Sequence, residues 1–247
     1  MGNSLYHTLN ISRHDLLNRM MDLDTISNNL ANVNTVGFRS SRMNFQELFN
    51  SQYLEGSTVN GSQTLTRQGV LQTTDNPFDW AIQGDGFFPV KLPNGETGYT
   101  RDGIFSLDGQ RQLVNSSGYV LDWDGQIPET TTGISISKTG EVTALLEDDT
   151  SQMIGNVELA RFANPSALIS AGTNVWIPGD ASGEAEMVQP GTEGMGFVQS
   201  YAYERSNVNM TEEMTRLIQV QRGFQMSARV LQQTDTMINL AIHVRKA

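Results

Sequence analysis

Few side chains in this 247-residue sequence are of the type and spacing that catalysis needs. The three histidines, His7, His14 and His243, lie in the terminal segments, away from any cluster of carboxylates. No Ser/His/Asp arrangement and no pair of carboxylates suited to general acid–base catalysis emerges. The sequence contains no cysteine, which excludes thiol catalysis, disulfides and cysteine metal sites. We therefore predict no catalytic residue and a protein that is not an enzyme.

Two acidic clusters could suggest calcium, at residues 122–125 (DWDG) and 147–149 (EDD). The first lacks the remaining oxygen ligands and the distal glutamate of a calcium loop. Solvated charge explains the second more simply. The glycines of residues 84–86 (GDG) lack the rest of a dinucleotide-binding fingerprint. The sequence predicts neither a metal ion nor a cofactor.

The net charge of −11 is unevenly spread along the chain. Residues 51–199 carry six basic and nineteen acidic side chains, whereas residues 1–50 carry four of each sign. An acidic middle argues against nucleic acid, which attracts basic surfaces, and suits a solvated outer surface. Charge-balanced ends suit close packing among many copies, because like charges near an axis would repel.

No targeting or membrane-spanning segment is visible. Residues 1–10 lack the basic start and apolar centre of a signal peptide, and no apolar run approaches the roughly 18 residues of a membrane span. We expect no membrane insertion. The protein is expected either to stay in the cytoplasm or to leave it by a route that reads no cleaved signal.

The elements that carry these residues begin with two helices, one at each end of the chain. Leucines recur every seven residues, at Leu9, Leu16, Leu23 and Leu30. The C-terminal segment places apolar residues mostly at three- and four-residue steps, at Met214, Leu217, Phe224, Ala228, Leu231, Ile238 and Ala241. Such periodicity is typical of a coiled-coil seam, which one helix cannot bury by itself. We predict helices over residues 4–33 and from Asn209 or Thr211 onward, which form a coiled-coil-like terminal domain.

The middle of the chain predicts an antiparallel all-β domain inserted between the helices, so the fold class is α+β. Short β-type runs alternate with Asp-Gly pairs, which favour hairpin turns, at residues 85–86, 102–103, 108–109 and 124–125. We expect a meander or an open barrel. The predicted domains are residues 1–50 (N-terminal helix with a short extension from 39), 51–66 (polar connector), 67–197 (outer β domain) and 198–247 (C-terminal helix).

Three blocks of sequence resemble the bacterial flagellar rod and hook protein family. The first is ISNNLANVNTVGF at residues 26–38, and the second is GDGFF at 84–88 followed by YTRDG at 99–103. The third is ERSNVN at 204–209, followed by EEM at 212–214 and QVQRGF at 219–224. The blocks occur in the family's order. Within the family the chain most resembles the distal rod proteins, with the proximal rod proteins as an alternative.

This resemblance implies a structural subunit of the flagellar basal-body rod. In the family, the terminal helices of many subunits pack into the wall of a helical tube that transmits torque to the hook, with β domains outside. The implied partners are further copies of the chain, other rod proteins, the hook protein, the flagellar type III export apparatus and, as a possibility, ring proteins around the rod. The implied location is the basal body, outside the cytoplasmic membrane.

The residues expected at the assembly interface come from the helical seams and from the junctions between helix and β domain. They are Leu9, Leu16, Leu23, Asn28, Asn29, Leu30, Asn32, Asn34, Gly37, Phe38, Ser206, Asn207, Val208, Asn209, Met214, Leu217, Phe224, Leu231 and Ile238. The asparagine amides are expected to satisfy backbone groups of a neighbouring subunit.

Three simpler interpretations remain open. The two helices could pair only within one subunit, as an antiparallel hairpin. The asparagines could merely end the helices. An alternative function is an adhesin-like β-domain binding module carried on a helical stalk.

Overall fold

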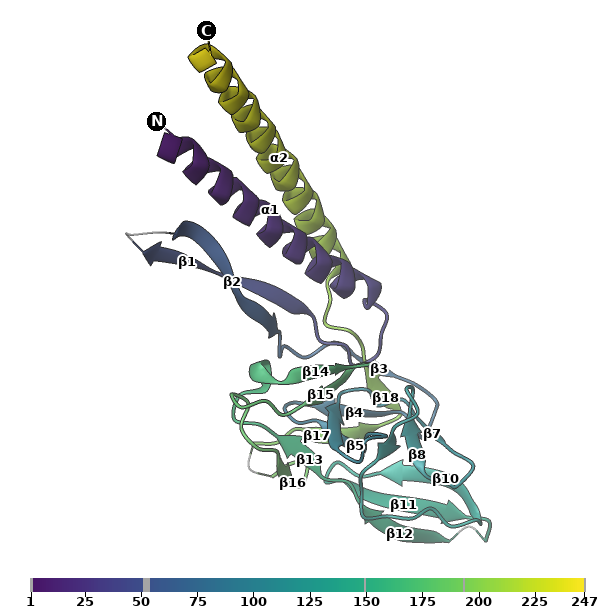
Figure 1. Ribbon diagram of the computed structural model, residues 1–247. Coiled ribbons are helices and arrows are strands. Elements are labelled where there is room, and N and C mark those ends of the chain that lie inside the picture. Colours follow the sequence, from purple (N-terminus) through teal and green to yellow (C-terminus); the bar gives the residue numbers. More distant parts are fainter. Residues whose placement is uncertain (1, 51–53, 149, 193, 247) are drawn as a thin grey trace. The chain divides into compact units, whose positions relative to one another are not determined.

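The computed structural model describes residues 2–50, 54–148, 150–192 and 194–246, with side chains described at all of these except 2–8, 45–50, 54–62 and 241–246. The chain divides into two compact units (Figure 1). Unit 1 combines Met1–Ala31, Ser41–Gln63 and Asn209–Ala247, and unit 2 combines Asn32–Ser40 and Thr64–Val208. Each unit is thus built from segments that lie far apart in the sequence.

The two long helices of unit 1 confirm the terminal helices that the periodicity predicts. Helix α1 spans Gly2–Ala31 and α2 spans Met210–Lys246. Asn209 caps α2, because its Oδ1 accepts hydrogen bonds from the backbone N–H groups of Thr211 (3.1 Å) and Glu212 (3.4 Å). Within their described residues, neither helix is apolar enough over a sufficient length to cross a membrane.

A strand pair occupies most of the region expected to hold a short extension and a connector. Strand β1 spans Ser41–Asn50, and it pairs with β2 (Leu54–Thr64) in a two-stranded sheet. Gln63 Oε1 accepts hydrogen bonds across the pair from Asn44 Nδ2 (2.9 Å) and Arg42 Nη2 (3.3 Å). Backbone pairing needs no apolar face, so the polar composition that indicated a connector is compatible with a strand. Residues 51–53 of the expected connector lie outside the described residues.

Unit 2 contains short strands and one 3-10 helix, η1 (Pro165–Ala167). The first strands are β3 (Leu71–Thr73), β4 (Trp80–Gln83), β5 (Phe88–Lys91), β6 (Thr97–Thr100), β7 (Phe105–Leu107), β8 (Leu113–Asn115), β9 (Val120–Leu121) and β10 (Thr131–Ile136). The later ones are β11 (Glu141–Leu146), β12 (Ser151–Asn156), β13 (Leu159–Arg161), β14 (Ile169–Gly172), β15 (Val175–Ile177), β16 (Glu186–Val188), β17 (Phe197–Ser200) and β18 (Ala202–Glu204).

The described strand pairings of unit 2 are antiparallel, as predicted, but only one sheet is a simple meander. That sheet has the order β10-β11-β12. The largest sheet has the order β14-β15-β6-β5-β9-β8-β7, and the pairs β17-β4 and β18-β3 join the end of the unit to its beginning. Tertiary pairing between distant strands, which local turn signals cannot specify, sets this order.

Two clusters of buried side chains form the core of unit 2. The larger one includes Trp80, Phe88 and Phe105, whose rings pack with centroids 5.3 to 5.4 Å apart. The smaller one is aromatic and consists of Phe87, Tyr99, Ala160, Phe162, Leu168 and Trp176. These clusters bury much apolar surface, which is the main force that holds a β domain of short strands together.

Of the four Asp-Gly pairs predicted as hairpin turns, residues 108–109 lie between paired strands, β7 and β8, whereas residues 85–86, 102–103 and 124–125 lie between strands that do not pair with each other. Asp102-Gly103 lies between β6 and β7, which belong to one sheet but are not neighbours in it. A Cβ atom at Gly103 would overlap the backbone carbonyl of Trp80, and that residue's N–H donates to the Gly103 carbonyl at 2.8 Å. Glycine is needed here for a close backbone approach, which a dipeptide pattern cannot distinguish from a turn.

Candidate functional site

The residues expected at the assembly interface lie at different depths and in both units. Those exposed are Asn28, Asn34, Asn209 and Met214, and those buried are Asn29, Gly37 and Asn207. Those half-buried are Leu9, Leu16, Leu23, Leu30, Asn32, Phe38, Ser206, Val208, Leu217, Phe224, Leu231 and Ile238. His14 is also half-buried, while the side chains of His7 and His243 are outside those described.

Within unit 1, α1 and α2 contact each other through polar side chains. Arg216 Nη2 donates a hydrogen bond to Asp22 Oδ1 at 2.7 Å, and Ser227 Oγ donates to Asp15 Oδ2. Asp22 thus contacts Arg216, whereas Asp15, earlier in α1, contacts Ser227, later in α2. The two helices therefore run antiparallel where they touch. Asp22 is only 7% exposed, which places an ion pair where a coiled coil would normally bury an apolar residue.

A glycine allows a close approach in the same region. Gly223 of α2 lies beside Arg19 of α1, whose guanidinium would overlap a Cβ atom at that position. Arg19 is held by an ion pair with Asp15 one turn earlier, at 2.8 Å. Sequence periodicity could not indicate this contact, because it depends on a missing side chain.

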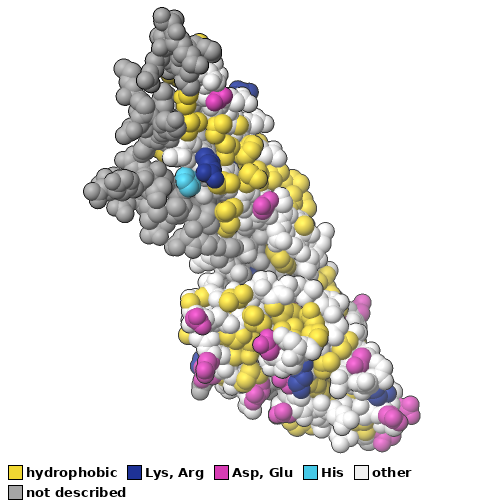
Figure 2. Space-filling view, viewed as in Figure 1, with side chains coloured by type: hydrophobic (Ala, Val, Ile, Leu, Met, Phe, Trp, Pro, Cys, Tyr) yellow, Lys and Arg dark blue, Asp and Glu magenta, His cyan; other side chains and the backbone are white. Residues whose placement is uncertain are grey.

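Several apolar side chains of α2 are exposed, although Val220 is buried and Met226 and Val230 line a pocket together with residues of α1. Five of the exposed ones follow one another at steps of 4, 8, 4 and 7 residues, and Figure 2 shows hydrophobic surface along the described part of the helix. The exposed fractions are 46% for Met214, 51% for Ile218, 68% for Met226, 43% for Val230 and 58% for Met237. We call these five residues the α2 stripe. Single exposed apolar residues are ordinary, but several along one helix favour a surface for interaction.

Asn29 links three backbone and side-chain groups of unit 1. Its Nδ2 donates to the Ser41 carbonyl (2.8 Å) and to Glu213 Oε1 (3.2 Å), and its Oδ1 accepts from the Ser41 N–H (2.9 Å). It is fully buried. Burial raises the pKa of Glu213, while the hydrogen bond from Asn29 acts in the opposite direction. Asn29 therefore fixes the end of α1 against the start of β1 and the first turn of α2.

In unit 2, residues 32–40 are fixed to the β domain through backbone contacts. Gly37 has φ +66°, and a Cβ atom there would overlap the backbone of Arg101. Its N–H donates to the Glu204 carbonyl at 2.7 Å. Asn174 Nδ2 donates to the Val36 carbonyl at 2.8 Å. Only glycine combines this left-handed conformation with this close approach, which gives Gly37 a specific role in the junction.

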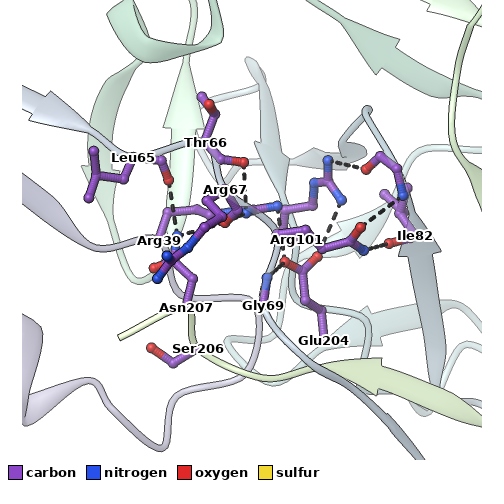
Figure 3. A network of polar contacts seen from close by, with 12 residues as sticks. Arg39, Leu65, Thr66, Arg67, Gly69, Ile82, Arg101, Glu204, Ser206 and Asn207 are labelled. Atoms are coloured by element: carbon purple, nitrogen blue, oxygen red, sulfur yellow. Dashed lines mark hydrogen bonds and ion pairs between the residues drawn. The ribbon is translucent and has the colours of Figure 1, made fainter. Parts of the chain in front are cut away.

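Asn207 makes a second junction contact, between three separate backbone segments. Its Oδ1 accepts from the Ser40 N–H (2.7 Å). Its Nδ2 donates to the carbonyls of Leu65 (3.1 Å) and Arg67 (2.7 Å), which Figure 3 labels. These bonds engage both polar ends of the amide within this chain. The expected role of Asn207 towards a neighbouring subunit therefore stays a prediction.

A buried ion-pair network connects the same segments. Glu204, 1% exposed, accepts from Arg39 Nη2 through Oε1 (3.0 Å) and from Arg101 Nη1 through Oε2 (3.2 Å). Its Oε1 also accepts the Gly69 N–H at 2.7 Å. Figure 3 shows both guanidinium groups converging on this carboxylate. We call Arg39, Arg101 and Glu204 the junction triad.

Burial sets the electrostatics of the junction triad. Burial lowers the pKa of Arg101 to about 10, and the nearby charge of Arg39 acts in the same direction, while Glu204 and Asp85 oppose it. Burial likewise lowers the pKa of Arg39, against the same two carboxylates. Both guanidinium groups stay charged at neutral pH, so each requires a compensating acceptor.

The arrangement positions backbones rather than reacting groups. Across the described ranges, no three His, Asp or Glu side chains come together in a way that could hold a metal ion. In the cluster considered for calcium, Asp122 pairs with Lys91 at 3.1 Å and the Trp123 ring packs over Gly125. What the geometry can do is hold the chain's entry to and exit from the β domain in one conformation.

The sequence analysis did not select the junction triad as site residues. Arg101 and Glu204 stand inside the quoted blocks and Arg39 follows the first block directly, but an isolated charge in a sequence normally indicates solvent exposure. A signal was available, because each of the three residues adjoins an expected junction or strand end. Only the tertiary structure brings them together.

Comparison with known proteins gives three family models that match this chain. They describe the flagellar hook protein FlgE/F/G D1 domain at residues 81–144, the flagellar basal body rod FlgEFG protein C-terminal region at 199–242 and the flagella basal body rod protein at 21–39. The matches lie in the first part of the β domain, over most of the C-terminal helix and across the N-terminal junction, where the motif blocks occur.

Similar curated proteins align along nearly the whole chain. The flagellar basal-body rod protein FlgG of Caulobacter vibrioides is 36% identical, with 92% of this chain and 95% of that protein covered. FlgG of Bacillus subtilis is 34% identical, with 91% and 93% covered. The flagellar basal-body rod protein FlgF of Mesorhizobium japonicum is 36% identical, with 89% and 90% covered.

Proposed function

The chain belongs to the family of flagellar basal-body rod proteins, and from this premise we propose that it is a structural subunit of the rod in the bacterial flagellar basal body, outside the cytoplasmic membrane. The observation that carries the proposal is the similarity to rod proteins over about nine-tenths of the chain. The alternative of an adhesin-like module on a helical stalk has no support among these relatives.

The role is structural rather than catalytic. Two observations support this role: the similarity to rod proteins, and a candidate site whose polar groups bind backbone carbonyls and N–H groups. In this role the subunit polymerises into a rigid tubular shaft that transmits torque to the hook. The junction triad would keep the chain segments that enter and leave the β domain from shifting under load.

Polymerisation uses the terminal helices. The support is the α2 stripe, which one copy of the chain leaves exposed, together with the heptad leucines of α1, which are only half-buried. Coiled-coil-like packing between copies would cover both sets of apolar side chains. The remaining residues expected at the interface, including Phe224, Leu231 and Ile238, would complete this packing.

The partners in this proposal are further copies of the chain, the other rod proteins and the hook protein, with the flagellar export apparatus during secretion. Ring proteins around the rod are a further expected contact. The distal part of the rod is the expected position, with the proximal part as the alternative. Electron microscopy of basal bodies from a deletion strain tests this, because assembly would stop at the segment that the missing subunit builds.

The test of the helical interface is Met226→Glu combined with Met237→Glu. Both side chains are more than half exposed, so the monomer should keep its fold while charges in the packed wall abolish polymers. Sedimentation and electron microscopy measure assembly, and fluorescence-detected unfolding reports on unit 2. The matched control is Gln225→Glu with Gln233→Glu, two exposed polar positions on the same helix. Normal assembly of the Met226/Met237 variant would show that the α2 stripe is not the interface.

A further inference from the structure

Four of the described hairpin loops of unit 2 share one backbone pattern. In each loop the N–H of the first residue donates to the carbonyl of the fifth, and the N–H of the fourth donates to the carbonyl of the first. The loops span residues 92–96, 108–112, 115–119 and 137–141. Such a loop is a type I turn followed by a bulge, and its fourth residue takes a positive φ, which favours glycine there.

Three of these loops have glycine at the fourth position, whereas one has an arginine. The φ angles are +85° for Gly95, +81° for Gly118, +89° for Gly140 and +60° for Arg111. The loop of Arg111 does contain a glycine, but Gly109 has no positive φ and a Cβ atom there would meet nothing within 4 Å. An arginine thus occupies the position where the backbone favours glycine, and an outlier of this kind indicates a function.

The loop holds Arg111 in this conformation and leaves its charge unpaired. Asp108 Oδ1 accepts hydrogen bonds from the backbone N–H groups of Gln110 (2.8 Å) and Gln112 (2.7 Å). No carboxylate of the described residues forms an ion pair with Arg111. Of its three side-chain nitrogens, Nε is buried without a partner. The two Nη groups, which form no hydrogen bond within the described part of the chain, are accessible to a ligand.

Arg111 lines a pocket of about 270 Å³. The side chains with polar or aromatic groups in the lining are Lys91, Gln110, Arg111, Gln112, Trp123 and Gln126. The Trp123 ring lies against the backbone of Gly125, where a Cβ atom would overlap it, so this wall of the pocket is fixed. The volume is small for a ligand site, for which about 300–1,000 Å³ is usual, and suits a ligand the size of one ring.

The chemistry of the lining favours one class of ligand. Lys91 already pairs with Asp122 at 3.1 Å, so the cation that the pocket offers to a ligand is Arg111. The three glutamine amides of the lining are exposed and form no hydrogen bond within the described ranges. A guanidinium binds a carboxylate through two parallel hydrogen bonds, and an amide can both donate to and accept from hydroxyl groups. An indole ring offers an apolar surface for the C–H groups of a sugar ring.

We propose that this pocket binds a sugar ring that carries a carboxylate. Arg111 binds the carboxylate, the glutamine amides bind the hydroxyl groups, and Trp123 packs against the ring. The pocket lies within unit 2 and uses no residue of the α2 stripe or of the junction triad. The inference is therefore independent of the proposed rod function.

Binding of trigalacturonate, a short acidic oligosaccharide, to the full-length protein tests the proposal. Isothermal titration calorimetry and saturation-transfer NMR should show a dissociation constant on the order of 1 mM, because one ring makes few contacts. Maltotriose is a neutral oligosaccharide of the same length, and succinate is a carboxylate without a sugar ring. Each should bind about tenfold more weakly. The proposal is overturned if trigalacturonate does not bind, or if either control compound binds as tightly.

Arg111→Gly tests the role of the arginine without endangering the fold. The substitution removes the guanidinium and supplies the residue that the backbone favours, so the unfolding temperature should not fall. The affinity for trigalacturonate should fall about tenfold. The matched control is Lys138→Ala, which removes one positive charge from the loop of residues 137–141, outside the pocket, and should change the affinity less than about twofold.

Two outcomes would overturn the assignment of Arg111. The first is an affinity for trigalacturonate that is unchanged in Arg111→Gly or falls equally in both variants. The second is a lower unfolding temperature for Arg111→Gly, which would show that the arginine serves the fold and not a ligand.

Discussion

Unit 1 and unit 2 differ in how they bury their large apolar side chains and their charges. In unit 2 the large aromatic residues are inside, with Trp80 and Phe88 at 0% exposure, and the buried charges of the junction triad are paired. In unit 1 the helix α2 leaves Met226 68% exposed, while Asp22 of α1 is 7% exposed. Unit 2 buries its large aromatic rings and pairs the charges of the junction triad, whereas unit 1 leaves apolar side chains of α2 exposed, which we propose another copy of the chain covers.

This difference indicates which part of the subunit is stable before assembly. A β domain with two buried clusters has its driving force within one copy. Helices whose apolar faces are solvated gain little from tertiary packing, on which most helical stability in proteins depends. We therefore expect unit 2 to be the more stable part of the monomer and unit 1 to gain stability on polymerisation.

The largest effect is expected from Glu204→Ala. The substitution leaves the buried guanidinium groups of Arg39 and Arg101 without their shared carboxylate, which should destabilise unit 2 by about 3–5 kcal/mol. Denaturant unfolding followed by tryptophan fluorescence measures the free energy. Glu186→Ala is the control, because its ion pair with Arg161 is solvent-exposed and should contribute about 1 kcal/mol or less. If both variants lost the same unfolding free energy, the buried ion pairs of the junction triad would contribute no more stability than the exposed Glu186–Arg161 pair.

A smaller effect is expected from Asn207→Ala. The variant loses hydrogen bonds to Ser40, Leu65 and Arg67 and leaves their backbone groups unpaired, for a loss of about 2 kcal/mol in the stability of unit 2. The same unfolding experiment applies. Ser206→Ala, a half-buried neighbour, serves as the control and should change the stability little. If Asn207→Ala were neutral in the monomer yet abolished polymers, the amide would act between subunits, as the sequence analysis expected.

The smallest effect is expected in unit 1, from Asp22→Ala. Its ion pair with Arg216 is partly exposed, with 10% and 33% of the two side chains accessible, so the loss should be about 1 kcal/mol. A double-mutant cycle with Arg216→Ala, followed by the helical circular dichroism signal on heating, isolates the pair. A loss for Asp22→Ala larger than the loss for Glu204→Ala would reverse the ranking of the two units.

The sequence predicted the elements better than their arrangement. Heptad leucines and the Asn209 cap placed both terminal helices within a few residues of their observed bounds. The strands β1 and β2 were missed, because their polar composition shows no alternating apolar face. The strand order of the largest sheet could not be predicted either, because β15 pairs with β6, which lies in a distant part of the chain.

The candidate site was predictable in location more than in detail. The junction blocks contain Gly37, Asn207 and Glu204, and the structure brings all three together within unit 2. What each residue contacts did not follow from its type. An asparagine can end a helix, join backbones or bind a neighbouring chain, and the positions of Ser40 and Leu65 decide for Asn207.

The resemblance of three motif blocks indicated the family. Periodicity, capping and turn chemistry are local properties, so the sequence also indicated the two helices and the antiparallel β character of the middle. The tertiary structure decided which charges are buried, which amides join backbones and which helical face stays exposed. These outcomes depend on segments up to about 200 residues apart, such as Asp15 and Ser227, whose proximity no local pattern encodes. Burial also changes what a charged side chain requires. On the surface water solvates the charge, whereas inside the protein the charge needs a hydrogen-bond or ion-pair partner.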